Sequence, residues 1–270
     1  HSHLLEGVRF NSNLAPPYFS REIGPQAASS TEFLRVPVYA ASAPGSHSPS
    51  LRFDGTNDFA TIPDSIAFDV IESTDTVTIE AWIYIESFPQ LWFSVIDKYE
   101  ADGDFGWMLQ INKTTGIEFQ TGRGFVSSGF VPTLNQWHHV ALTYSLAEKY
   151  ARFYSDGVLV ATEELNAEIK ATQGEPLYLG FNPSGGDEFS HGRINELRIW
   201  NSVRSADEIL SGMNRHFSGQ ESGLAGYWRL DSSDEFVLHD LTPNGKHGTV
   251  GSGGAKPNWL SSDLALRAFS

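Results

Sequence analysis

The chain has 270 residues, no cysteine and a formal net charge of −15 at pH 7. Without cysteine, disulfides, zinc–thiolate sites and thiol nucleophiles are excluded. The acidic surface repels phosphate backbones, which disfavours nucleic acid as a partner, and it favours cations such as calcium. No run of about 18 apolar residues is present, so we expect no membrane span.

Residues 1–48 show little periodicity and contain several prolines, with an Ala/Ser/Gly-rich stretch from residue 40 onward. We expect an extended N-terminal arm with one strand near residues 33–39, and the alternative is a linker to an upstream domain. The beginning, His1-Ser2-His3, is typical of a trimmed or mature end, so we expect that a signal peptide has been removed.

From residue 51 onward the pattern predicts many short strands. Residues 77–85 alternate between apolar side chains on one face and polar or aromatic side chains on the other. Asp156-Gly157 predicts a two-residue hairpin turn. The expected strands cover residues 51–53, 59–62, 77–85, 92–97, 106–111, 116–121, 137–144, 150–155, 158–162, 176–180 and 192–200.

One helix is expected after Ser205, because Ser205 and Glu208 fit the capping box and apolar Ile209, Leu210 and Met213 follow. The tail adds strands at residues 224–230, 248–250 and 259–260. Many short strands without regular alternation of strand and helix indicate an all-β fold: a sandwich of two antiparallel sheets with one short helix.

Six motifs follow one another in the middle of the chain. They are LRFDGTNDF at 51–59, TIEAWI at 78–83, QWHHVALTY at 136–144, FYSDG at 153–157, LYLG at 177–180 and GRINELRIWN at 192–201. In order and spacing they resemble the laminin-G-like jelly-roll domains of the concanavalin A-like lectin/glucanase superfamily. The resemblance covers about residues 49–217 and implies a concanavalin A-like jelly-roll sandwich. Asn195 departs from the Asp usual in the family.

We therefore expect three segments: an arm at 1–48, the laminin-G-like jelly roll at 49–217, and a C-terminal segment at 218–270 that completes the same sandwich. The last segment has some 50 residues, which bury too little surface to fold well alone. The chain is compatible with being one part of a larger multidomain protein.

A calcium site is the first candidate for chemistry. Asp54, Asn57 and Asp58 lie within five residues at a turn, and Glu196 on a later strand could return beside them. Related jelly rolls often carry a structural calcium, which the resemblance therefore implies here. The alternative is that the first three residues form turns with their own backbone and that Glu196 pairs with an arginine, Arg52 or Arg198.

Two other clusters are weaker metal candidates. Asp97, Glu100, Asp102 and Asp104 surround a loop that we interpret as solvated, because the spacing of a calcium-binding EF-hand loop is missing. The rings of His138 and His139 are expected on opposite faces of a strand, where they cannot bind one ion together.

The ligand-binding prediction depends on aromatic and polar residues near loops. Aromatic rings stack on sugar faces, while carboxylates, guanidinium groups and imidazoles bond to sugar hydroxyls; the alternative is that each ring covers an end of the sandwich. The predicted ligand-binding residues are Trp92, Tyr99, Phe105, Arg123, Asp187, Glu188 and His191.

The leading hypothesis is a calcium-stabilised, lectin-like module that recognises a glycan or an extracellular protein ligand on a secreted or cell-surface protein. One alternative is a polysaccharide lyase or hydrolase that uses the loop rim, and another is a structural adhesin repeat. No strand carries a string of carboxylates at i, i+2 or i+4 on a concave face, as glycosidases usually do, so we assign no catalytic residue and favour binding over catalysis.

Overall fold

The strand predicted at residues 77–85 forms most of β3 (Thr76–Ser87) in the computed structural model of the chain. Its five inward apolar side chains, from Val77 to Ile85, are buried in the core between two sheets. The side chains between them point to the opposite face, because successive residues of a strand alternate. The predicted all-β sandwich of two antiparallel sheets is thereby confirmed.

The structure describes residues 49–98, 105–122, 124–172, 174–183, 188–231, 236–251 and 257–261. The arm predicted at residues 1–48 lies outside these ranges, as do Tyr99, Arg123 and Asp187 of the predicted ligand-binding set. The acidic loop residues Glu100, Asp102 and Asp104 also lie outside them.

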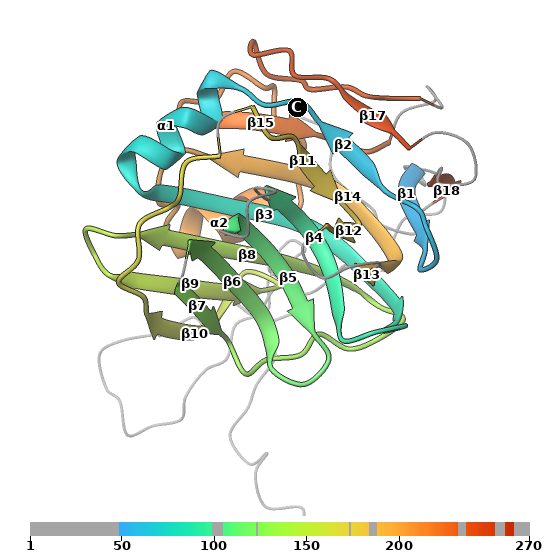
Figure 1. Cartoon of the computed structure of the whole chain (residues 1–270), viewed down its shortest axis with the longest axis horizontal. Coiled ribbons are helices and arrows are strands. Elements are labelled where there is room, and N and C mark those ends of the chain that lie inside the picture. The colour runs from blue at the N-terminus through green and yellow to red at the C-terminus, as the bar shows by residue number, and fades with distance from the viewer. Residues whose placement is uncertain are drawn as a thin grey trace, which may run out of the picture. The chain divides into compact units, whose positions relative to one another are not determined.

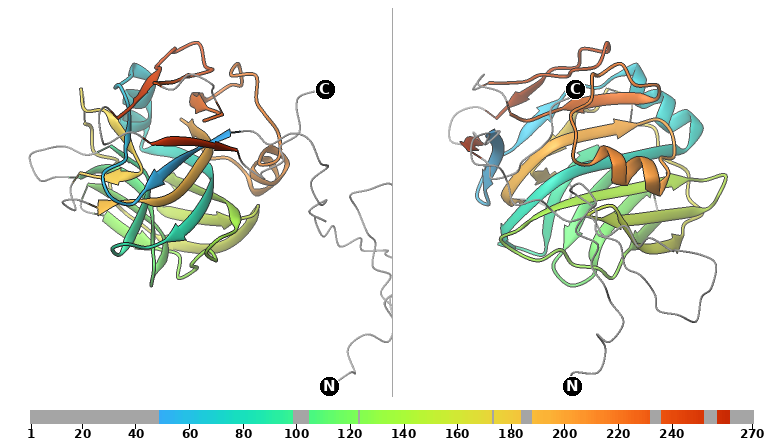
Figure 2. Two further views of the ribbon diagram at one scale, coloured as in Figure 1. Left: turned by 90° about the vertical axis from the view of Figure 1, so that its right-hand side faces the viewer. Right: turned by 180° about the vertical axis from the view of Figure 1, so that it is seen from behind.

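We call the sheet that lies behind in Figure 1 the rear sheet. Its strand order is β10 (Val158–Glu164), β9 (Tyr150–Ser155), β8 (Trp137–Ser145), β3, β14 (His191–Trp200), β1 (Pro49–Asp54) and β18 (Asn258–Ser261), and β15 (Leu224–Trp228) also pairs with β14. The view from behind in Figure 2 shows this sheet with a short helix across it.

The front sheet faces the viewer in Figure 1. Its order is β16 (Val237–Leu238), β17 (Gly248–Val250), β2 (Ala60–Ile62), β11 (Leu177–Leu179), β4 (Trp92–Lys98), β5 (Phe105–Asn112), β6 (Gly116–Gly122) and β7 (Gly124–Ser127). A separate hairpin of β12 (Phe181–Asn182) and β13 (Glu188–Phe189) contacts β4. Through β15 to β18, residues after 217 therefore contribute to both large sheets.

Two helices are described where the sequence predicted one. The helix α2 (Ala206–Gly212) begins at the predicted capping box, with the Ser205 and Glu208 side chains each accepting from the other's backbone N–H. The unpredicted helix α1 (Ile66–Thr74) begins at Ser65, whose hydroxyl accepts from the Ala67 N–H, and it buries Phe68 and Ile71. No described helix is long and apolar enough to span a membrane.

A buried lysine attaches α1 to the front sheet. The Lys98 ammonium is fully buried and lies 2.8 Å from Glu72 of α1 and 3.0 Å from Asp64. It also donates to the Thr172 carbonyl at 2.9 Å, and the Thr172 hydroxyl donates to Glu72. The Lys98 ammonium therefore connects β4 with α1, with the turn before α1, and with the segment that leads to β11.

We expect Lys98→Met to lower the free energy of unfolding by about 3 kcal/mol, because it leaves the buried Glu72 carboxylate without its cation. Lys113→Met, at an exposed turn between β5 and β6, is the matched control and should cost less than about 0.5 kcal/mol. Urea denaturation measures both, and equal midpoints for the two variants would contradict the role of Lys98.

Candidate functional site

Three of the four predicted calcium ligands form a turn after β1. The Asp54 Oδ1 atom accepts from the backbone N–H groups of Thr56 and Asn57 at 2.8 and 3.4 Å. Asp58 Oδ2 accepts from the Asp54 N–H at 2.9 Å. Burial and the neighbouring Asp54 charge raise the pKa of Asp58 to about 6. These carboxylates bond to their own backbone, as in the alternative interpretation of this turn.

Glu196 lies elsewhere and is already paired. Its carboxylate accepts from Arg198, Tyr227 and His216, each at 2.7 Å, and it is 1% exposed. In the β1–β14 register Asp54 lies opposite His191, five positions along β14 from Glu196, or roughly 15 Å. The structure therefore does not bring Glu196 together with Asp54, Asn57 and Asp58.

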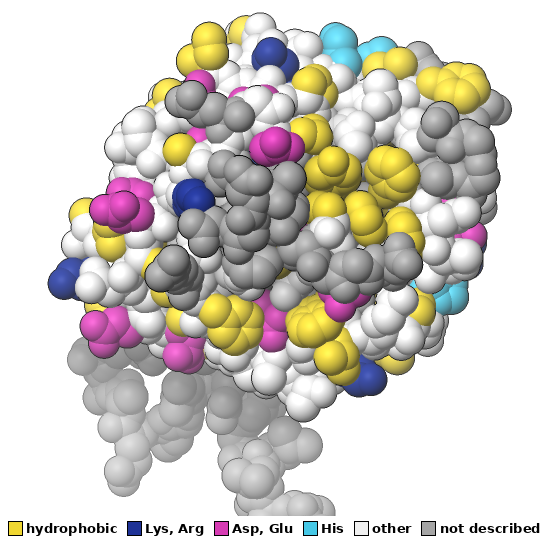
Figure 3. All heavy atoms as spheres, viewed as in Figure 1, with side chains coloured by type: hydrophobic (Ala, Val, Ile, Leu, Met, Phe, Trp, Pro, Cys, Tyr) yellow, Lys and Arg dark blue, Asp and Glu magenta, His cyan; other side chains and the backbone are white. Residues whose placement is uncertain are grey.

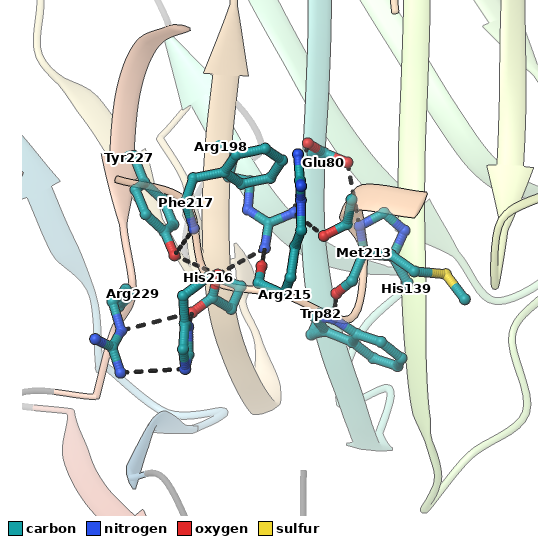
Figure 4. A network of polar contacts seen from close by, with 12 residues as sticks. Glu80, Trp82, His139, Arg198, Met213, Arg215, His216, Phe217, Tyr227 and Arg229 are labelled. Carbon is teal, nitrogen blue, oxygen red and sulfur yellow. Dashed lines mark hydrogen bonds and ion pairs between the residues drawn. The ribbon is translucent and has the colours of Figure 1, made fainter. Parts of the chain in front are cut away.

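Through Arg198, Tyr227 and His216, Glu196 belongs to a buried polar network on the outward face of the rear sheet. Figure 4 shows these three partners together with Glu80 and His139. Burial would raise the pKa of Glu80, but the His139 ring and the Arg198 charge lower it to about 2. Arg198 is fully buried, 2.7 Å from Glu196 and 3.6 Å from Glu80. Trp200 Nε1 also donates to Glu80 at 2.9 Å.

The same network holds α2 and the segment after it against the sheet. Arg198 donates to the carbonyls of Gly212 and Arg215, and Trp82 Nε1 donates to the Met213 carbonyl at 2.7 Å. Glu80, Glu196 and Arg198 are covered by the protein itself, so this part of the network stabilises the fold. His138 bonds separately to Asp156, as expected for neighbouring residues on a strand.

Half-buried aromatic rings gather on the front sheet instead. The Phe59 ring centroid lies 6.4 Å from that of Tyr178 and 5.8 Å from that of Phe181. Phe181 stacks on Phe189 at 4.6 Å with an interplanar angle of 15°. Figure 3 shows hydrophobic side chains gathered on this side of the molecule, where β2, β11 and the β12–β13 hairpin lie.

Two acidic side chains adjoin these rings. Asp97 pairs with Tyr178 across β4 and β11; it is 1% exposed, and neither of its carboxyl oxygens has a hydrogen-bond partner among the described residues. Burial and the charge of Glu188 raise the pKa of Asp97 to about 8. Glu188 accepts from the Asn182 amide at 3.1 Å, and burial raises its pKa as well.

We call these seven residues the front patch: Phe59, Asp97, Tyr178, Phe181, Asn182, Glu188 and Phe189. The predicted residue Trp92 lies on the same face at the start of β4, where its Nε1 donates to Glu118 at 2.9 Å. Gln110 donates to the same carboxylate oxygen at 2.9 Å. Hydrogen bonding to Glu118 thus fixes the Trp92 ring on this face.

The structure divides the predicted ligand-binding residues between two sheets. Trp92 and Glu188 lie at the front, whereas His191 begins β14 of the rear sheet and contacts Ser87 and Glu86 at 2.7 and 3.1 Å. Phe105 begins β5, where it pairs with Gly122 of β6. Sequence reasoning missed Phe59, Tyr178, Phe181 and Phe189 as one group, because they meet only when β2, β11 and the β12–β13 hairpin come together.

A hollow of about 820 Å³ lies at another position, lined by Glu72, Asp75, Gly122, Leu146 and the segment 166–171. None of its described lining residues is aromatic. Two of its carboxylates are engaged with the protein, since Asp75 accepts from the Ile169 N–H and Glu72 from Lys98. The front patch is therefore the better candidate for a sugar ligand.

A family model described as the concanavalin A-like lectin/glucanases superfamily matches residues 54–210, more than half of the chain. The chain belongs to this superfamily, and the predicted concanavalin A-like jelly roll is confirmed. Within the described residues, no three His, Cys, Asp or Glu side chains are placed to hold a metal ion together.

Solved structures show the same fold at low sequence identity. A candidate carbohydrate-binding protein from Bacteroides ovatus is 20% identical with a TM-score of 0.64, and the match covers 87% of this chain and 68% of that one. A heptameric pentraxin from Limulus polyphemus is 15% identical with a TM-score of 0.46, over 79% and 99% of the two chains. A Ruminococcus gnavus sialidase module bound to α2,3-sialyllactose is 16% identical with a TM-score of 0.45, over 60% and 95%. No curated protein matches the chain in sequence.

The buried Asp97 carboxyl gives a testable dependence of stability on pH. Its folded pKa is about 8, well above the value of an unfolded aspartate, so the folded state binds the proton more tightly. In metal-free buffer this group should therefore lower the stability as pH rises from about 4 to about 8. We expect the stability of Asp97→Asn relative to the wild type to rise by more than about 2 kcal/mol between pH 4.5 and pH 8.

Urea denaturation across this pH range measures the difference. Glu164→Gln on exposed β10 is the matched control and should follow the wild-type profile. A difference between Asp97→Asn and the wild type that does not change with pH would contradict a buried, protonated Asp97.

Proposed function

We propose that this chain is a carbohydrate-binding module and that the front patch is its binding surface. The observation that carries the proposal is the close packing of four half-buried aromatic rings beside Asp97, Asn182 and Glu188. Aromatic rings present flat apolar surface to the faces of sugar rings, and carboxyl and amide groups bond to the hydroxyls at their edges. Export from the cell to where such glycans occur is part of the same proposal.

The front patch is also preformed, which favours binding. Ser94 of β4 donates to the Phe181 carbonyl at 3.2 Å, and the Ser190 hydroxyl donates to the Ser94 carbonyl at 3.1 Å. The β12–β13 hairpin is thereby attached to the sheet on both sides of its stacked phenylalanines. Side chains that are already ordered lose little entropy when a ligand binds.

Calcium fits this surface better than the turn after β1. Among the described residues Asp97 is a buried carboxyl without a hydrogen-bond partner beside a second carboxyl, which is costly unless one of them is protonated or a cation lies between them. Asp97 and Glu188 would provide carboxylate oxygens to the ion, and the Asn182 side chain adjoins Glu188. The bound ion would neutralise the two carboxylates and could offer a coordination position to a sugar hydroxyl.

We expect Tyr178→Ala to weaken glycan binding at least about 10-fold, because it removes one face of the aromatic cluster. Tyr150→Ala removes an exposed ring from β9 of the rear sheet and is the matched control. A glycan array identifies the ligand, and isothermal titration calorimetry then compares the variants at matched melting temperature. Equal loss in both variants, or no binding to any glycan, would overturn the proposal.

We expect 5 mM calcium to raise the melting temperature of the wild type and not that of Asp97→Asn. This concentration exceeds the dissociation constants of about 0.1–1 mM that are typical of extracellular calcium sites. Because the ion competes with a proton on Asp97, its apparent affinity should rise between pH 6 and pH 8. Differential scanning fluorimetry with calcium and with chelator tests this. An equal response of wild type and variant would place any calcium site elsewhere.

A further inference from the structure

The outward face of the rear sheet has one half that α2 covers and another half whose described side chains are half-buried, which we call the open half. The helix α2 and the segment after it cover Glu80, Trp82, His139 and Arg198, each of which is at most 3% exposed. The other half carries half-buried side chains of β1, β14, β3 and β8. Of the predicted ligand-binding residues that the structure describes, His191 lies in this open half. No residue of the front patch lies there.

The strand register aligns its side chains in one row. Arg52 of β1 lies opposite Arg193 of β14, Arg193 opposite Tyr84 of β3, and Tyr84 opposite Trp137 of β8. Directly opposed residues on neighbouring strands point to the same face with their Cβ atoms about 5 Å apart. Two guanidinium groups and two aromatic rings therefore form a continuous surface, which we call the rear row.

One carboxylate organises the basic end of the rear row. Glu86 accepts from Arg52 Nε and Nη2 at 2.9 and 2.7 Å, and the His191 ring is 3.1 Å away. The charges of Asp54 and Asp58 also act on Arg52 and, with Glu86, raise its pKa. Arg52 is thus neutralised by carboxylates on its own side.

Arg193 is held differently. Its Nε atom lies 3.4 Å from Glu86, and its guanidinium lies over the Tyr84 ring at 4.8 Å. Within the described residues, its two terminal nitrogens contact no acceptor, and its side chain is 21% exposed. Glu86 and Tyr84 therefore fix a guanidinium fork whose two outer N–H groups face solvent, the geometry that binds a carboxylate through two hydrogen bonds.

The aromatic half indicates what carries that carboxylate. The Tyr84 and Trp137 rings meet at 5.6 Å in a T-shaped arrangement, and Trp137 packs on the buried Trp82 and Met213. A rigid pair of rings beside a guanidinium fork matches a flat apolar sugar face with an attached acid group. A phosphate alone would use the fork and leave the rings without contact.

We infer that the rear row is a second ligand site, which binds the carboxylate-bearing sugar units of an acidic polysaccharide. Arg193 would bind the carboxylate, while Tyr84 and Trp137 would pack against the sugar ring. The site lies on the sheet opposite the front patch and does not depend on the function proposed for that patch.

The test uses trigalacturonic acid as the probe and the carboxyl-reduced trimer as its neutral match, by isothermal titration calorimetry on the full chain. We expect the acidic trimer to bind at least about 10-fold more tightly than the reduced one, with an affinity that falls as salt rises. Arg193→Gln should abolish this preference, and Arg193→Lys, which keeps the charge and loses the fork, should restore part of it.

Arg152→Gln, which removes a half-buried arginine of β9 that pairs with Glu148, is the matched control and should bind like the wild type. Tyr178→Ala of the front patch should also leave binding of the acidic trimer unchanged, which separates failure of this inference from failure of the front-patch proposal. Equal affinities in Arg193→Gln and Arg152→Gln, or the absence of any binding, would overturn the inference. Competition by inorganic phosphate at the concentration of the trimer would overturn the assignment to a sugar.

Discussion

The arrangement of the rear sheet depends on one buried cation, Arg198. Its guanidinium is fully enclosed and lies between the carboxylates of Glu80 and Glu196, neither of which reaches solvent. Removing Arg198 would leave both buried carboxylates without their shared cation, and loss of one partner of a buried ion pair commonly costs about 3–5 kcal/mol. Because the same guanidinium donates to the carbonyls of Gly212 and Arg215, this ion network also keeps α2 and the segment after it on the sheet. The boundary between the covered half and the open half of the rear face follows from that attachment.

The two outward faces consequently present different chemistry. The front patch combines aromatic rings with carboxyl groups whose pKa values are raised by burial, so it favours a cation or the hydroxyl groups of a sugar. The rear row combines aromatic rings with a fixed guanidinium, so it favours an anion. In a chain with 33 acidic and 18 basic side chains, long-range charge favours cations everywhere, and binding of an anion requires a local geometry such as that of Arg193.

Much of the fold could be predicted from local patterns, because alternation and capping are encoded within a few neighbouring residues. The inward side chains of β3 and the capping box of α2 are examples. Two features could not be read this way. The helix α1 begins directly after Pro63-Asp64, which suggests a turn, and its stabilising partner Lys98 is distant in sequence. At Glu196 the backbone φ is +53°, and the resulting bulge shifts the alternation, so that Ile194 and Leu197 both face the core while Glu196 and Arg198 face outward.

The candidate site was harder to predict for a related reason, which Asp97 illustrates. In the sequence it is a polar residue at the end of a strand, next to an acidic loop, and solvation was the simplest interpretation. Its burial arises because β11 places Tyr178 opposite it and because the β12–β13 hairpin brings Glu188 close. A position whose role was purely structural would be better filled by a side chain with a hydrogen-bond partner, since an unpartnered buried carboxyl lowers stability. The stability lost by burying the Asp97 carboxyl is therefore an argument that this group binds a ligand. The aromatic rings around it indicate which face of the sandwich that ligand approaches.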